Sequence, residues 1–284
     1  MNKVPVSFLI PVKNEAANLP RCLASIAWAG EIWVVDSQST DGTPAMAEAA
    51  GARVVQFQYN GSWPKKRNWA LENLTFKHEW IFLIDADETL PPEAAEELRA
   101  IATGAGECAA YQVDRRFWFL GQWLNHAYRP NWIVRFFRRG KARFAQLTDA
   151  DIHHADHEIH EPMIVDGKIG RLRSEMAHYA FPTIESFVEK HNVYSGWEAH
   201  VTLSEEQRPP AHDFGWRQRA KRWSRHLPCR PLLRFLFVYV WQRGFLDGRA
   251  GYYFARLHAM YEFLSVAKTY ELRLRPNEDS RLGD

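Results

Sequence analysis

The first hundred residues alternate short apolar runs with segments of helical periodicity, and this alternation limits the possible folds more than any other feature. Asn18 and Thr43 stand where helices can begin, and Gly51 stands where the second of these helices can end. Strands that alternate with crossover helices form a parallel sheet. We therefore expect an α/β fold whose first strands are the apolar runs at residues 6–12, 31–36, 52–57 and 80–84.

The alternation becomes less regular after residue 105. A helix is expected from Pro91-Pro92 to about Thr103, and a long helix is expected to begin after Thr183. Two further strands, rich in Trp, Phe and Arg, are expected at residues 109–119 and 131–138. With 284 residues, 46% of them hydrophobic, the chain can form one large domain or a domain with an appendage.

Three cysteines, Cys22, Cys108 and Cys229, are too far apart for a disulfide framework or a zinc site, which favours a reducing cytoplasm. The apolar amino terminus contains Pro5 and Pro11, and no small-residue cleavage site follows it, so we interpret it as a first strand rather than a secretion signal.

Charge divides the chain at Arg208. Residues 1–207 contain 21 Lys/Arg and 27 Asp/Glu, a net charge of −6, whereas residues 208–284 contain 15 and 7, a net charge of +8. A basic segment on an acidic body indicates an anionic partner, either nucleic acid or the cytoplasmic face of a membrane.

Aromatic residues within the basic segment favour the membrane. Trp216 and Trp223 are seven residues apart and share one helical face, with Arg222 beside them, and the run Leu232 to Trp241 is almost wholly apolar. No run reaches the ~20 apolar residues of a spanning helix. Basic and aromatic residues on amphipathic segments are typical of an interfacial anchor. We therefore expect an anionic membrane surface as partner, and no nucleic acid.

Two carboxylates, one residue apart, directly follow the fourth apolar run, in Asp85-Ala86-Asp87. In an α/β sheet this position is the carboxyl edge of the strands, where ligands bind. Clustered carboxylates suit Mg²⁺ or Mn²⁺, which can neutralise a diphosphate. An isolated acidic pair more often forms a turn than a metal site, so the other motifs at the strand ends decide whether this pair is functional.

Four motifs occur in order at successive strand and helix ends. Together they resemble the family-2 glycosyltransferases, inverting enzymes of the GT-A fold, over roughly the first 140 residues. The motifs are Pro11-Val12-Lys13-Asn14-Glu15, Asp36-Ser37-Gln38-Ser39-Thr40-Asp41, Lys65-Lys66-Arg67-Asn68 and Asp85-Ala86-Asp87.

The resemblance implies a UDP-sugar donor site and a divalent cation, Mg²⁺ or Mn²⁺. Glu15 and Asp36 would contact the base and ribose, and Asp41 would shape that pocket. Asp85 would approach the ribose or the metal, and Asp87 would bind the metal. A cation held by carboxylates would stabilise the departing diphosphate. The other donor-binding candidates are Pro11, Lys13, Lys66, Arg67 and Asn68.

Inversion in one displacement requires a general base opposite the leaving group. A His-Glu pair followed by Asp166-Gly167 resembles the subgroup that acts on the lipopolysaccharide inner core, which makes Glu161 the expected base and His160 its orienting or metal-binding neighbour. Glu158 and Asp156 are the alternatives. The spacing His157-Glu158-Ile159-His160 lacks the i, i+4 histidines of a metalloprotease helix. A second metal site from His153, His154 and His157, or a plain solvated loop, stays open.

The carboxyl-terminal sequence 243–251, followed by Ala267-Lys268, resembles the same subgroup, the inner-core β-1,4-glucosyltransferases. The resemblance assigns Arg243 and Asp247, with Trp216, Arg222 and Trp223, to a platform for the acceptor and the membrane. A packing helix with glycine bends explains the sequence equally well.

We therefore expect a GT-A catalytic domain over residues 1–207 and a basic, aromatic, helical segment over 208–284. Residues 1–105 would bind the nucleotide-sugar and residues 106–207 the acceptor. The expected enzyme transfers a hexose, glucose by resemblance, to a lipid-linked saccharide at the cytoplasmic face of the bacterial inner membrane. Transfer to polyprenyl phosphate or another cell-surface glycan, and a non-catalytic nucleotide-sugar-binding module, are the alternatives.

Overall fold

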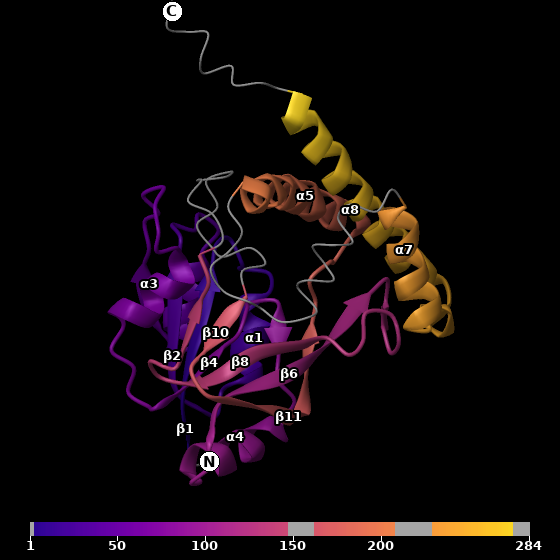
Figure 1. The fold of residues 1–284 in the computed structure, drawn as a ribbon. Helices are drawn as coiled ribbons and strands as arrows, with labels where there is room; N and C mark the ends of the chain where they lie inside the picture. The colour runs from indigo at the N-terminus through magenta and orange to yellow at the C-terminus, as the bar shows by residue number, and fades with distance from the viewer. Residues whose placement is uncertain (1–2, 147–161, 208–228, 275–284) are drawn as a thin grey trace, which may run out of the picture. The chain divides into compact units, whose positions relative to one another are not determined.

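The computed structural model describes residues 3–146, 162–207 and 229–274, which fall into two compact units (Figure 1). The first unit comprises the chain up to Trp118, Arg129–Gln146 and the described residues up to Ala180. The second unit comprises Phe119–Tyr128 and the described residues from Phe181 onward. This division is based on contacts within the structure. The boundary predicted at residue 207 is based on charge and motifs, and it stays a prediction.

A mixed, mostly parallel sheet forms the centre of the first unit, as the sequence predicted. β1 (Val4–Val12) lies between β2 (Ala29–Asp36) and β4 (Trp80–Leu83), and it is parallel to both. The full strand order is β3-β2-β1-β4-β8-β6-β11-β5. The remaining strands of this order are β3 (Arg53–Gln56), β5 (Glu88–Thr89), β6 (Cys108–Phe119), β8 (Trp132–Arg138) and β11 (Lys168–His178).

The direction of the later strands determines which residues reach the carboxyl edge. β8 is antiparallel to both β4 and β6, so β6 runs in the same direction as β4. β11 is parallel to β6 and therefore also ends at the edge where β4 ends. The final residue of β11, His178, is thus brought to the edge that carries the acidic motif after β4.

Helices cover both faces of the sheet, which explains why β1 is apolar at consecutive positions. Val6, Phe8 and Ile10 pack on one side with α1 (Leu19–Ser25), α2 (Thr43–Ala49) and α4 (Ala94–Thr103). Leu9 packs on the other side with α3 (Lys66–Asn73) and with β9 (Ala142–Phe144), which pairs with β10 (Met163–Val165). Successive side chains of a strand point to opposite faces, so a strand covered on both faces is mostly apolar. Ser7 of β1 is buried as well, and its hydroxyl donates a hydrogen bond to Glu31 (2.6 Å).

The helix starts differ in detail from the sequence prediction. Asn18 precedes α1, but its side-chain amide donates to Glu15 Oε2 (2.9 Å) and makes no capping bond. Thr43 is the first residue of α2 rather than its cap, and Gly42, with φ of +85°, precedes it. Gly51 follows α2 at φ of +83°, in the left-handed conformation expected of a stop signal.

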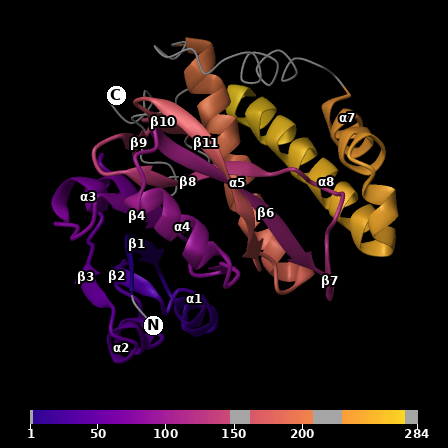
Figure 2. The same cartoon turned by 90° about the horizontal axis from the view of Figure 1, so that it is seen from below.

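Long helices form the second unit. α5 (Ile184–Gln207) begins with a reciprocal pair in which Ser186 N–H donates to Thr183 Oγ1 (3.0 Å) and Thr183 N–H donates to Ser186 Oγ (3.2 Å). α5 and α7 (Arg230–Leu236) both pack against α8 (Gly248–Leu274), and Figures 1 and 2 show these helices side by side. In the part of the chain that the structure describes, no helix has both the length and the apolar character needed to cross a bilayer.

A tight corner joins α7 to α8. A π-helical turn, η1 (Phe237–Trp241), is followed by Arg243 with φ of +57° and by the 3-10 helix η2 (Gly244–Asp247). Gly251, in the first turn of α8, lies against this corner, and a Cβ atom at Gly251 would approach the carbonyl oxygen of Gly244 to 1.9 Å. Only glycine fits there without displacing backbone.

Gly251→Ala should therefore destabilise the second unit, because backbone must move to admit the methyl group. We expect a loss of about 1–3 kcal/mol in the free energy of unfolding, measured by urea denaturation. Gly106→Ala is the matched control, since its Cβ would meet only the Tyr111 hydroxyl, at 3.5 Å. Equal stability of the Gly251→Ala and wild-type proteins would contradict a tightly packed corner.

Candidate active site

The loops that follow β1 and β2 are bonded to each other at the carboxyl edge of the sheet. Asn14 N–H donates to Ser39 Oγ (2.7 Å), and Thr40 N–H donates to Asn14 Oδ1 (2.8 Å). Ala16 N–H donates to Asp41 Oδ2 (2.9 Å). These bonds join two motifs that are more than twenty residues apart in the sequence, and we call the result the joined loops.

Carboxylates that accept hydrogen bonds hold the joined loops in place. Asp36 is buried at the end of β2, and its side chain accepts hydrogen bonds from the backbone N–H (3.0 Å) and the hydroxyl of Ser39. Asp41 accepts hydrogen bonds from the Thr43 hydroxyl (2.5 Å) and from Ala16 N–H, and these bonds hold its pKa below the usual value. Glu15 N–H donates to Thr43 Oγ1 (2.9 Å), which adds a further bond between the loops.

The basic motif at the start of α3 points in several directions. Lys66 is buried and donates to the carbonyl oxygen of Val12 (2.9 Å), at the end of β1. Asn68 donates to the carbonyl of Phe144 (3.0 Å) and accepts from its N–H (2.9 Å), so the amide attaches β9 to α3. Arg67 donates to Asp85 Oδ1 (2.7 Å). Arg67 is thus the member of the motif that reaches the acidic pair.

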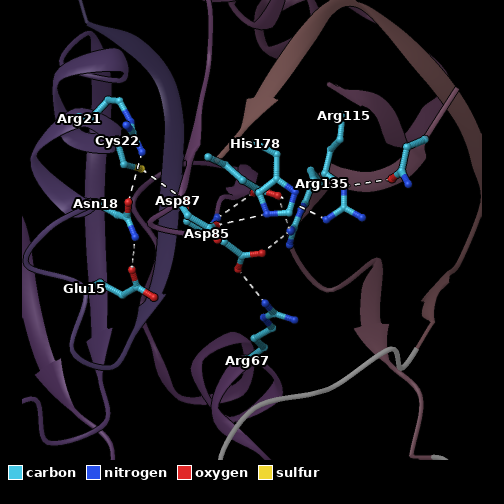
Figure 3. Close-up of polar contacts among 12 residues, drawn as sticks. Glu15, Asn18, Arg21, Cys22, Arg67, Asp85, Asp87, Arg115, Arg135 and His178 are labelled. Carbon is cyan, nitrogen blue, oxygen red and sulfur yellow. Dashed lines mark hydrogen bonds and ion pairs between the residues drawn. The ribbon is translucent and has the colours of Figure 1, made fainter. Parts of the chain in front are cut away.

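Asp85 is the centre of a charged cluster (Figure 3). Its carboxylate binds both Arg67 and Arg135, and its backbone N–H donates to Glu88 Oε2 (2.9 Å). Burial alone would raise the pKa of Asp85, but the charges of Arg135 and Arg67 outweigh it and hold this pKa far below the usual range. Asp85 therefore stays ionised throughout the physiological pH range.

Arg135 connects Asp85 to a second carboxylate, Glu88, which is completely buried. Arg135 Nη2 lies 3.0 Å from Glu88 Oε1, and Arg115 Nη1 lies 3.6 Å from the same oxygen. Burial opposes the charge on Arg135, yet the two carboxylates raise its pKa above the ordinary value. The Arg135 guanidinium therefore remains charged.

The Asp87 carboxylate lies beside His178. Its Oδ1 is 3.4 Å from His178 Nε2, at the end of β11, and both side chains are largely buried. Tyr179 N–H donates to the carbonyl of Asp87 (2.8 Å), which joins this loop to the chain after β11. Figure 3 shows the His178 ring beside the Asp85–Asp87 loop.

These residues fit a divalent cation. Asp87 offers a carboxylate, and His178 offers an imidazole whose Nδ1 is buried without a hydrogen-bond partner among the described residues. Mg²⁺ is commonly held by one or two carboxylates together with substrate phosphates, so a complete all-protein site is not required. Within the described ranges, no group of three or more His, Cys, Asp or Glu side chains is arranged to hold a metal. The sequence also assigned Asp85 to the metal, but the Asp85 carboxylate forms ion pairs with two arginines.

The structure thus brings together, in its first unit, most of the residues that the sequence selected for the donor and the metal. Lys13 is exposed just beyond β1, and Pro11 lies within β1 opposite Val35. The predicted base Glu161, His160 and the alternatives Glu158 and Asp156 lie outside the described residues, as do Trp216, Arg222 and Trp223. The individual roles assigned to all these side chains stay predictions.

Arg243 and Asp247 belong to the second unit, in the corner before α8. The buried Asp247 carboxylate accepts hydrogen bonds from the N–H groups of Asn125 (2.9 Å), His126 (2.9 Å) and Ala127 (2.7 Å). Burial opposes its charge, but these bonds hold the pKa of Asp247 below its usual value. The carboxylate thereby anchors the 125–127 loop, and its predicted role in acceptor binding stays a prediction.

Sequence reasoning missed Glu88, Arg135 and His178. Glu88 directly follows the acidic pair, and Arg135 lies in a strand that was predicted as rich in Arg, so both carried a weak signal. His178 carried none, because β11 was not predicted. Only the strand order places His178 beside Asp87.

A mostly parallel sheet covered by helices on both faces, with an acidic pair at its carboxyl edge, defines a GT-A-type nucleotide-sugar fold. The family described as "Glycosyl transferase family 2" matches residues 7–155, just over half of the sequence. The chain belongs to this family, as its motifs predicted.

Similar proteins agree with this assignment. The chain is 28% identical to the "Lipopolysaccharide core biosynthesis glycosyltransferase LpsC" of Rhizobium meliloti, over 99% of this chain and 98% of the relative. It is also 28% identical to an uncharacterized glycosyltransferase of Rickettsia bellii, over 98% and 90% of the two chains. A mannosyltransferase from Pyrobaculum calidifontis, solved with GDP-Man and Mn²⁺, shares the fold at 14% identity, with a TM-score of 0.54 over 95% of this chain and 88% of that one.

Arg135→Met should strongly destabilise the first unit, because it leaves the buried Glu88 and Asp85 carboxylates short of a cation. We expect a loss of about 3–5 kcal/mol at pH 7, measured by urea denaturation. Lys168→Met is the control: Lys168 and its partner Glu107 are both mostly exposed, so the loss of this surface pair should cost about 1 kcal/mol or less.

The difference in stability between the wild type and Arg135→Met should also depend on pH. Because the folded-state pKa of Asp85 lies below the unfolded value of about 3.9, the ion pair stabilises the wild-type protein fully above that pH. This stabilisation is lost as the pH falls below about 4. The difference between wild type and Arg135→Met should therefore shrink in acid, and a constant difference would argue against an ionised Asp85.

Proposed function

We propose that this glycosyltransferase transfers a hexose, most simply glucose, from a UDP-sugar to a lipid-linked saccharide of the lipopolysaccharide core, at the cytoplasmic face of the membrane. The observation that carries the donor half of this proposal is the Asp87–His178 pair beside the Asp85 cluster, in a chain of this family. The acceptor half is supported by similarity to LpsC over nearly the whole of both chains.

The joined loops after β1 and β2 form the proposed nucleotide end of the donor site. Glu15 and Asp36 are assigned to the base and ribose, with Asp41 supporting the loop and with Pro11 and Lys13 adjoining it. Because Asp36 and Asp41 also hold the backbone of this unit, their loss would disturb the pocket as well as remove a contact. Glu15 is the better residue with which to test nucleotide binding.

Asp87 and His178 form the proposed diphosphate end, where a Mg²⁺ or Mn²⁺ ion would be held. Such an ion, when bound, neutralises negative charge that develops on the departing diphosphate. Arg67 and Arg135 keep Asp85 ionised and in place, and Lys66 and Asn68 fix the start of α3 against β1 and β9. In this proposal their task is to hold the site in shape around the donor.

Glu161 is the proposed general base, which takes the proton of the acceptor hydroxyl during an inverting displacement. His160 is assigned to its orientation, and the product linkage would be β. Support for these roles comes from the sequence resemblance, since both residues lie outside the described part of the chain.

The most direct test measures UDP release from a panel of UDP-sugars, with and without purified core oligosaccharide. The proposal requires release from one UDP-hexose to rise when the oligosaccharide is added. Polyprenyl phosphate serves as a competing acceptor in a parallel assay. Stimulation by polyprenyl phosphate alone would overturn the lipopolysaccharide assignment while leaving the donor assignment intact.

Asp87→Asn should reduce transfer by two or more orders of magnitude and raise the Mn²⁺ concentration required for half-maximal rate, because one anionic ligand is lost. His178→Ala should shift the Mn²⁺ requirement in the same direction. Asp166→Asn is the control, since that exposed carboxylate pairs only with Lys141, at 2.7 Å, among the described residues. Near wild-type transfer by Asp87→Asn would refute the metal role.

Glu161→Gln should lower the transfer rate by orders of magnitude while leaving UDP binding nearly unchanged, because a base acts on the acceptor and not on the nucleotide. The comparison variants are Glu158→Gln and Asp156→Asn, which remove the alternative bases. UDP binding is measured by calorimetry and transfer by UDP release. An equal loss of binding and transfer would assign Glu161 a structural role.

A further inference from the structure

The segment of α7 and η1 exposes six apolar side chains and shields its two arginines. Trp241 is the extreme case, with 81% of its surface exposed. The exposed positions recur in pairs every four residues and are all apolar: Leu232, Leu233, Leu236, Phe237, Val240 and Trp241. This is the reverse of the pattern of a helix that packs on a core and faces water.

The buried side of the same segment holds ion pairs. Arg230 is buried and forms ion pairs in which its Nε lies 2.5 Å from Glu262 Oε2 and its Nη2 lies 3.7 Å from Glu198 Oε1. Arg234, one turn later, lies 4.0 Å from Glu262 and over the ring of Tyr128. These pairs attach the segment to α5 and α8 by its charged face, so its apolar face is turned away from the unit to which it belongs.

The apolar surface continues onto η2 and the start of α8. Tyr239 contacts the rings of Phe245 and Tyr252 at centroid distances of 6.2 and 5.8 Å, and Tyr252 contacts Tyr253 at 5.6 Å. Phe245, Tyr252 and Tyr253 are exposed, as is Leu246. We call this surface the apolar ridge: the six exposed residues between Leu232 and Trp241, together with Phe245, Leu246, Tyr252 and Tyr253.

Positive charge borders the apolar ridge. Arg243, Arg249 and Arg256 are exposed along η2 and α8, and Arg256 lies 6.0 Å from the ring of Phe235. Between Arg230 and Glu262 the sequence contains a single acidic residue, Asp247, whose buried carboxylate is occupied by the 125–127 loop. Within residues 231–261 the exposed charged side chains are therefore all arginines.

We propose that the apolar ridge docks this protein onto a phospholipid bilayer with anionic headgroups. Aromatic and aliphatic side chains enter the boundary between headgroups and acyl chains, and the bordering arginines contact the headgroups. A second copy of the chain fits less well, because a symmetric interface would bring the same arginines together. The predicted anchor at Trp216–Trp223 is a different segment, and this proposal does not depend on it or on the identity of the acceptor.

The proposal is tested by flotation of the full-length protein with vesicles of phosphatidylcholine, with and without phosphatidylglycerol. We expect the wild type to float with the anionic vesicles and the Leu236→Ser/Trp241→Ser variant to bind them at least tenfold more weakly. Ile169→Ser is the matched control, because it removes an exposed aliphatic side chain from the first unit. Thermal unfolding and UDP release from the donor confirm that each variant is folded.

A second variant, Arg249→Gln/Arg256→Gln, tests the charge. It should weaken binding to anionic vesicles by roughly fivefold for each arginine and leave binding to neutral vesicles unchanged. Wild-type flotation of the Leu236→Ser/Trp241→Ser variant would overturn the proposal. So would binding that requires a glycolipid acceptor in the vesicle, or a dimer in sedimentation velocity that the same two substitutions dissociate.

Discussion

The buried ion cluster of Asp85, Arg135 and Glu88 is the interaction on which the candidate site depends. Isolated carboxylates cannot be buried at the end of a strand without a large desolvation cost, so the acidic loop exists in this form only because a guanidinium lies between them. Arg67 adds a second cation from the opposite side. The two carboxylates of the acidic pair therefore have different partners. Asp85 pairs with two arginines, whereas Asp87 lies beside His178.

This difference in partners changes the interpretation of the Asp-x-Asp motif. Two adjacent carboxylates suggest two equivalent ligands, but their surroundings differ. Asp85 pairs with Arg67 and Arg135, whereas the carboxylate of Asp87 lies 3.4 Å from His178. In the proposed donor site it is therefore Asp87 to which we assign the cation. Asp85 instead fixes the loop that presents Asp87.

The first half of the fold was predictable because its local signals and its tertiary structure agree. Strands covered on both faces must be apolar at consecutive positions, and β1 and β4 carry this pattern plainly. β11 alternates the buried Leu172, Ser174 and Met176 with charged, exposed residues, but it was missed because the polar Ser174 interrupts the apolar face on which the alternating pattern depends. The order of the four motifs along the chain predicted the family. Arg135 and His178 were not, because only nonlocal strand pairing brings them to the edge.

The reversed strand β8 has a consequence for the order in which the site is completed during synthesis. Asp85, Asp87 and Glu88 are made early, but their buried partner Arg135 emerges about fifty residues later, and His178 later still. A ribosome-bound chain that ends near residue 105 has the acidic loop without these two side chains. The acidic edge therefore acquires its native environment only after β8 and β11 have joined the sheet. The acidic loop lies in the first half of the sequence, but its partners Arg135 and His178 come from strands that follow it.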